Sequence, residues 1–301
     1  MKKLILLFCF VITASFSQAQ QYNLGLGIRL GASNFLGDIG SGDVARNFIY
    51  NLEIRDTRWD AGIFARYRFN PLFAAQVSFD YARIQGEDAN SDNRARLGRN
   101  LSFRNDMLHL AAKFEFYPQV LSIADVGYRG RYQLDYQTYF FAGVGGVYHN
   151  PKAEYNGQWV SLRPLMTEGV SYSPVALTLP FGGGFFFTYK KQHRFGFELG
   201  WNMTFTDYLD DISTQYVAPS EMGNDPLAPT LANRYKGGGT VPDGVQYGPG
   251  SPRGDPTDND NFITMSVSYS YLLRTRGSFY RKNYSWMYGR KRRWGGTKAK
   301  F

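Results

Sequence analysis

Apolar and polar residues alternate with a period of two in eight segments of this chain, each about ten residues long. In one of them every second position is apolar: Tyr22, Leu24, Leu26, Ile28 and Leu30. Successive side chains of a β-strand point to opposite faces, so each segment predicts a strand with one apolar and one polar face. In another segment Pro180 cannot donate a ladder hydrogen bond, which predicts a bulge or a rim position there. The predicted strands are residues 22–31, 59–69, 73–81, 108–116, 138–149, 177–187, 195–205 and 263–271.

The connections between these segments predict the topology. Bacterial outer-membrane barrels have short periplasmic turns and long external loops. The chain has short connections at 70–71 and 190–194 and long ones at 36–58, 87–100, 150–174 and 207–261. The connection at 118–135 is longer than the rule predicts for the periplasmic end. A soluble lipocalin-like barrel would place the apolar face inside, whereas the long loops and the Trp and Tyr residues at strand ends favour the membrane form. We therefore predict an all-β fold, an eight-stranded antiparallel transmembrane β-barrel with long external loops and a basic C-terminal tail.

The N-terminal residues predict export. Lys2 and Lys3 precede an apolar stretch at 4–16, and a small-x-small cleavage site follows. The only cysteine, Cys9, lies in that stretch, so we expect a mature chain without disulfides. Charged residues make up 20% of the chain, which fits a protein whose lipid-facing positions exclude charge. We predict a signal peptide at 1–19, the outer-membrane barrel at 20–273 and a separate tail at 274–301.

Charged residues on the inner face of the predicted strands predict a closed lumen. Eight-stranded barrels are filled by their own side chains, and buried charges need partners. Opposite charges are therefore expected to pair into a plug that stops diffusion of solutes, and no feature supports a proton or ion path. The predicted plug consists of Arg29, Asp60, Arg66, Arg68, Asp80, Lys113, Glu115 and Glu198.

The three histidines give little support to catalysis or metal binding. His109 is predicted to point into the lumen, His149 to lie at the external rim and His193 to lie in a periplasmic turn. Their scatter excludes a metal site built from histidines. His149 alone is placed for catalysis at the rim, but the sequence fixes no Ser or Asp partner. We predict that the protein is not an enzyme and has no cofactor and no metal.

Two acidic groups flank the longest loop. Residues 206–211 carry three aspartates, and Asp255, Asp258 and Asp260 precede the last strand. Carboxylates at one loop base could bind calcium, but the spacing does not match an EF-hand. We expect these side chains instead to accept backbone N–H groups in turns.

The C-terminal segment 274–301 contains ten Lys or Arg residues and no acidic residue. Such a run on a cytosolic protein would suggest nucleic acid, which an exported barrel does not meet. In the periplasm the segment could bind anionic head groups or dock on an acidic partner through arginine and aromatic side chains. The predicted partner contacts are Arg281, Lys282, Trp286, Arg290, Lys291, Arg292, Arg293 and Trp294.

Several stretches carry a family resemblance, and the most specific are Asn-Pro-Lys-Ala at 150–153 and Thr-Asp-Tyr-Leu-Asp-Asp-Ile-Ser at 206–213. With the stretches at 30–38, 66–70 and 162–169, they resemble the PorG-like outer-membrane barrels of the type IX secretion system, which also serves gliding motility. The resemblance implies a non-enzymatic outer-membrane component whose partners are the periplasmic ring lipoprotein and its partner subunit, with outer-membrane lipid or lipopolysaccharide around it.

Two other functions stay open at this point. The first is a generic surface barrel whose loops bind a ligand or lipopolysaccharide. The second is a lipid-modifying barrel enzyme that uses His149.

Overall fold

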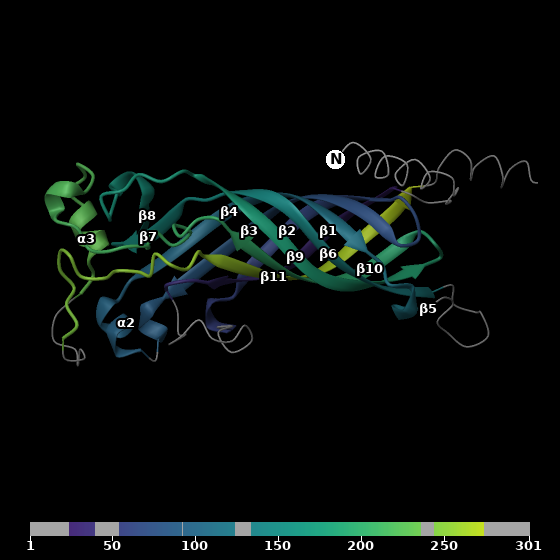
Figure 1. Cartoon of the computed structure of the whole chain (residues 1–301), viewed down its shortest axis with the longest axis horizontal. Helices are drawn as coiled ribbons and strands as arrows, with labels where there is room; N and C mark the ends of the chain where they lie inside the picture. Colours follow the sequence, from purple (N-terminus) through teal and green to yellow (C-terminus); the bar gives the residue numbers. More distant parts are fainter. Residues whose placement is uncertain (1–23, 40–53, 92, 124–133, 236–243, 274–301) are drawn as a thin grey trace, which may run out of the picture.

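The computed structural model describes residues 24–39, 54–91, 93–123, 134–235 and 244–273. Eight long antiparallel strands form a barrel (Figure 1). They are β1 (Leu24–Leu36), β2 (Arg58–Arg68), β3 (Phe73–Glu87), β4 (Ser102–Phe116), β6 (Leu134–Tyr148), β9 (Val175–Tyr189), β10 (His193–Thr204) and β11 (Asn261–Leu273). Each pairs with its neighbour along the chain, while β1 pairs with β11 and β4 pairs with β6. The sheet therefore has no free edge among these strands, and the predicted fold is confirmed. The predicted signal peptide and tail lie outside the described residues.

The apolar face of each strand points away from the barrel axis. Leu30 on β1, Val144 on β6 and Leu177 on β9 are 59%, 62% and 69% exposed. Glycine, serine and charged side chains occupy the alternate, inward positions and are largely buried. This orientation is the one expected of a membrane barrel and the reverse of a lipocalin.

Pro180 lies inside β9 rather than at a rim. The β6–β9 pairing breaks off between the pairs Ala142–Phe181 and Gly145–Thr178 and then resumes in the same register. Because proline has no N–H to donate, the ladder loses hydrogen bonds there without gaining a residue. The predicted bulge is therefore wrong, and the interruption is local.

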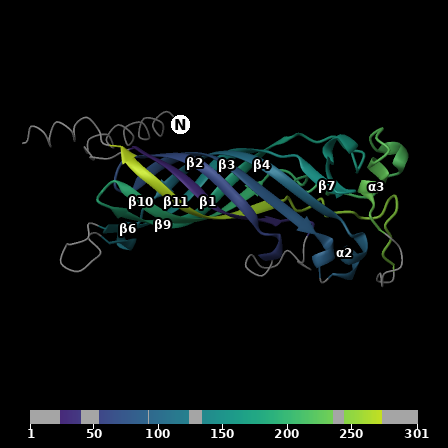
Figure 2. The same cartoon turned by 180° about the vertical axis from the view of Figure 1, so that it is seen from behind.

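The two ends of the barrel differ in the length of their connections. The turn at 69–72 and the turn at 190–192 lie at one end, together with η4 (Gln119–Leu121) and β5 (Ser122–Ile123), which pairs with the start of β6. At the opposite end the long loops build a compact extension (Figures 1 and 2). It includes η2 (Ile54–Asp56), η3 (Asp88–Asn90), α2 (Arg94–Arg99), β7 (Pro151–Tyr155), β8 (Gln158–Ser161), η6 (Arg163–Leu165), η7 (Pro219–Glu221) and α3 (Ala228–Ala232). Among the described helices, none has the length and apolar character needed to cross a bilayer.

Candidate functional site

Arg29 is the centre of the charged layer inside the barrel. Its guanidinium group lies 2.8 Å from Glu198 Oε1 and donates from Nε to Asp80 Oδ1 at 2.5 Å. Lys113 Nζ donates to the same Glu198 oxygen at 2.7 Å. A side chain on Gly62 would lie 1.8 Å from Asp80 Oδ1, so glycine there is what lets Asp80 reach Arg29. Strands β1, β3, β4 and β10 are thus joined across the lumen by one ion-pair network.

Arg66 forms a second network nearer the short-turn end. Arg66 Nε lies 2.9 Å from Glu115, and Arg66 also donates to the Gln76 side-chain oxygen at 2.8 Å. The Tyr117 hydroxyl donates to Glu115 Oε2. The guanidinium carbon lies 4.9 Å from the ring centre of Tyr139, which adds a cation–π contact. All five side chains are buried, and the charges of Arg66 and Glu115 are paired with each other.

Two residues of the predicted plug have other surroundings. Asp60 is buried and makes no ion pair within the described residues, and its Oδ1 has no hydrogen bond. Arg68 donates to the Gln137 side chain at 2.7 Å and to the Pro71 carbonyl at 2.6 Å, and its guanidinium lies 4.4 Å from the ring of Tyr117. Of the eight predicted residues, six therefore lie in ion pairs in the part of the chain described.

Arg194 is a lumen charge that the sequence reasoning missed. It is buried at the short-turn end, with its guanidinium 4.4 Å from the Phe186 ring centre. Its position shares the parity of Glu198 on the same strand, and that signal could have found it. His109 points into the lumen as predicted and lies 2.9 Å from Thr178 Oγ1.

Apolar clusters close the lumen on both sides of the charged layer. The cluster toward the short turns consists of Ala74, Tyr117, Tyr139, Phe141 and Phe186. The cluster toward the long loops includes Phe35, Ile84, Phe103, Met107 and Phe262. Between them a cavity beside Arg29, Asp60 and His109 has a volume of about 10 Å³, room for about one water molecule. The described lumen is therefore filled in three layers.

His149 lies buried at the external end of the barrel. Its ring stacks on Tyr172 at 6.1 Å, and Tyr172 stacks on Tyr208 at 4.6 Å. Its nitrogens make no hydrogen bond to a hydroxyl or carboxylate in the described residues. Burial, aided by the nearby charge of Arg163, lowers its pKa to about 4. A neutral, fully covered imidazole without a nucleophile beside it gives no support to catalysis at the rim.

Aspartates of the long loops accept hydrogen bonds both within turns and between loop segments. Three of them accept a backbone N–H: Asp210 from Ile212 (2.9 Å), Asp260 from Leu209 (2.9 Å) and Asp255 from Thr257 (3.1 Å). The bonds of Asp210 and Asp255 are the turn role that the sequence predicted, because each reaches an N–H two residues away. Asp260 instead bonds to a residue 51 positions away and joins two loop segments. In the part of the chain described, no group of three or more His, Cys, Asp or Glu side chains is arranged to hold a metal ion.

These loop carboxyl groups are easier to protonate than exposed ones. Burial raises the pKa of Asp207 to about 7, with the negative charge of Asp38 adding to the effect. Burial and neighbouring aspartates also raise the pKa values of Asp210 and Asp260 well above the usual value. The loop cluster is therefore a region whose charge changes between acidic and neutral pH.

Arg253 fastens the loops to one another. It lies 2.9 Å from Glu168 and 3.6 Å from Asp211, and all three side chains are buried. Glu168 also accepts the backbone N–H groups of residues 213 and 214, at 3.1 and 2.9 Å. The segments 162–169 and 206–213, two of those that carry the resemblance described above, thus meet around Arg253. Sequence spacing gave no sign of this ion pair, because Arg253 is 85 residues from Glu168.

The chain is similar to several solved structures at low sequence identity. One of these structures is Ail, the attachment invasion locus protein of Yersinia pestis, in complex with the heparin analogue sucrose octasulfate. Its sequence is 12% identical, the match covers 84% of this chain and 100% of that chain, and the TM-score is 0.34. Neisserial surface protein A has 9% identity, coverages of 83% and 97% and a TM-score of 0.38. OprG of Pseudomonas aeruginosa has 11% identity, coverages of 85% and 98% and a TM-score of 0.37.

The sequence comparisons give a family without a function. No curated protein sequence matches the chain. The model of a family described as "Domain of unknown function (DUF6089)" matches residues 1–221, and the chain belongs to this family.

Proposed function

We propose that the barrel spans the outer membrane, with the long loops outside the cell and the short turns in the periplasm. The support is the continuous apolar outer face of its eight strands, because lipid contacts only that face of a closed barrel. The measurement is fractionation of cells that express the full chain. The protein should stay in the membrane fraction after alkaline carbonate, and its release into the aqueous fraction would contradict the location.

Within this location the protein is a non-conducting, non-enzymatic scaffold. The observation that carries this proposal is the lumen, in which a charged layer lies between two apolar clusters and the cavity beside Arg29 has room for about one water molecule. The purified barrel should give no stepwise conductance in a planar lipid bilayer. Regular single-channel steps from the wild-type protein would refute the scaffold and favour a pore.

The partner proposed for the scaffold is the type IX secretion machinery. The barrel would anchor or assemble the periplasmic ring lipoprotein and its partner subunit, in service of protein secretion and gliding motility. The resemblance at 150–153 and 206–213 supports this role. So does the charge of residues 274–301, whose ten basic side chains would lie on the periplasmic side beside the ring.

Deletion of residues 274–301 tests the role. The truncated barrel should still reach the membrane and show heat-modifiable migration, but it should lose co-purification with the ring subunits. A matched control keeps the length of the tail and its aromatic residues and replaces its ten basic residues with glutamine. If charge makes the contact, this control should fail as the deletion does. Co-purification and secretion at wild-type levels in the deletion strain would overturn the proposal.

A surface-binding barrel is the second candidate, and the packing of the external loops favours it. Seven buried residues form a separate apolar core there: Ala153, Leu162, Leu165, Met222, Ala228, Leu231 and Ala232. Such packing holds an external surface in one shape, which suits recognition of a ligand or of lipopolysaccharide. Replacing 206–260 with a short turn should abolish such binding and leave co-purification with the ring intact.

A further inference from the structure

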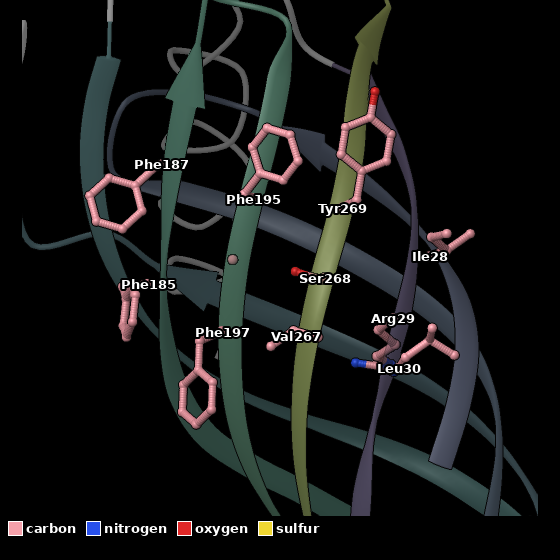
Figure 3. A pocket seen from close by; sticks show the side chains of 11 residues that line it. Ile28, Arg29, Leu30, Phe185, Phe187, Phe195, Phe197, Val267, Ser268 and Tyr269 are labelled. Atoms are coloured by element: carbon pink, nitrogen blue, oxygen red, sulfur yellow. The ribbon is translucent and has the colours of Figure 1, made fainter. Parts of the chain in front are cut away.

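The outer wall of the barrel carries an apolar groove over β9, β10, β11 and β1. Its volume is about 410 Å³ (Figure 3). The side chains of Phe195 and Phe197 project along β10, and those of Ile28 and Leu30 project along β1. Val267 on β11 lies between these two rows, paired in register with Phe197 on one side and Leu30 on the other. Because valine is shorter than its neighbours, it forms the floor of the groove.

The character of the wall changes from the groove toward the short turns. One step along the strands, the Tyr269 hydroxyl lies 3.0 Å from His193 Nδ1. Beyond them Gln192 donates to the Tyr271 hydroxyl at 3.0 Å. The exposed Lys190 and Lys191 form the tip of the turn. Apolar, hydrogen-bonding and cationic groups thus follow one another along a single line down the barrel.

The length of this line matches one leaflet of a bilayer. Phe197 and Lys191 are six residues apart, which is ~20 Å at ~3.4 Å per residue. A strand tilt of ~40° reduces this to ~15 Å along the membrane normal, half of a hydrocarbon core of ~30 Å. When the two lysines lie at the depth of the phospholipid head groups, this length places the floor of the groove near the middle of the membrane.

The turn itself is made from residues that its geometry disfavours. The Gln192 N–H donates to the Tyr189 carbonyl at 3.2 Å, and the two residues between them have positive φ angles, 49° at Lys190 and 60° at Lys191. Turns with two positive φ angles favour Asn-Gly, because a Cβ atom costs free energy in this region, glycine has none, and the short polar side chain of asparagine can hydrogen-bond locally. The turn therefore has two lysines at positions where the positive φ angles favour other residues, and these lysines place two positive charges at the end of the groove.

We propose that the groove and the Lys190–Lys191 turn form one binding site for a phospholipid with an anionic head group. The acyl chain lies over Val267 between the β10 and β1 side chains, and the phosphate faces the two ammonium groups, with the Tyr269–His193 pair at the level of the ester region. The charge of the turn and the depth of the groove are complementary to this one class of lipid. The inference rests on the proposed membrane location.

The test is retention of phosphatidylglycerol by the full-length protein, measured by native mass spectrometry after reconstitution in phosphatidylcholine nanodiscs doped with phosphatidylglycerol. Variant K190N/K191G removes both charges and introduces the residues that the turn prefers, so it should fold at least as well as wild type. Variant V267F fills the floor of the groove. Variant V77F is the matched control, because Val77 is an exposed, lipid-facing valine on β3, away from the groove.

Loss of two charges near the membrane surface should lower phosphatidylglycerol retention by roughly tenfold or more. V267F should cause a several-fold loss, and V77F should retain the lipid as wild type does. Unchanged retention in K190N/K191G, unchanged retention in V267F, or an equal loss in V77F would each overturn the site. These outcomes are distinct from failure of the membrane location, which would appear as wild-type protein extracted by alkaline carbonate.

Discussion

Glu198 offers a direct measure of what the charged layer contributes. It accepts hydrogen bonds from Arg29 (2.8 Å), Lys113 (2.7 Å) and the Tyr139 hydroxyl (2.7 Å) in a fully buried position. E198M leaves Lys113 without the carboxylate that it pairs with in the described lumen, and removal of one partner of a buried pair costs about 3–5 kcal/mol. K113M should cost less, ~2–3 kcal/mol, because Glu198 keeps its pair with Arg29.

The double variant E198M/K113M should be far more stable than the sum of the single changes. It removes one charge of each sign, and Arg29 keeps its pair with Asp80, so the remaining cost is the Tyr139 hydroxyl that loses its acceptor, about 1–3 kcal/mol. The expected coupling energy is ~3 kcal/mol or more.

The assay is equilibrium unfolding in urea from lipid vesicles, followed by tryptophan fluorescence. Additive single and double variants would refute the interpretation of these residues as one ion-pair network. A matched pair of changes on the lipid-facing side of the same strands, L110M and L199M, should be nearly neutral and additive.

Three further outcomes are expected in the external loops. Because the pKa of Asp207 is raised from 3.8 to about 7, the folded loops bind protons that the opened loops release. The protection factors of the amides in 206–213, which are corrected for the intrinsic pH dependence of exchange, should therefore fall as the pH rises through this range, and D207N should flatten that fall. R253M leaves Glu168 and Asp211 buried without their cation, so the long loops should become protease-sensitive while the barrel keeps its heat-modifiable migration. H149A should leave the lipid A profile of the cells unchanged, and a changed profile would restore the enzyme hypothesis.

The sequence predicts the membrane part of this fold better than the rest, for a physical reason. Lipid on one side and packed lumen on the other force a period of two, and all eight segments with that period are strands. Outside the lipid the constraint relaxes, so the extension of β3 from the predicted end at 81 to Glu87 was missed. The alternation likewise predicts that Arg29 points inward. It does not predict that Arg29 pairs with Asp80, which is 51 residues away, because that contact depends on how the strands pair in the closed sheet.

The contacts between the long loops could not be predicted from the sequence, for a related reason. Arg253 carries no periodic signal, and its contacts with Glu168 and Asp211 depend on three loops folding onto one another. The role of Asp210 and Asp255 was predictable, because a turn aspartate bonds to a backbone N–H two residues away. The bond from Leu209 to Asp260 was not, because the two residues are 51 positions apart. Hydrogen bonds within a turn could therefore be predicted from the sequence, whereas contacts between distant loop residues could not.

The charged lumen also specifies which face of each strand points inward. A slip of one residue in strand pairing turns every side chain to the opposite face. A slip of β1 or β4 would place Arg29 or Lys113 against lipid, at ~2–4 kcal/mol for each base near the membrane centre. An apolar interior would remove this difference, because both faces would then suit lipid. The charges therefore select one register even where their ion pairs add little net stability. We accordingly expect E198M/K113M to lose only the ~1–3 kcal/mol of the unpaired Tyr139 hydroxyl but to refold with a larger misinserted fraction, and equal refolding yields would count against this role.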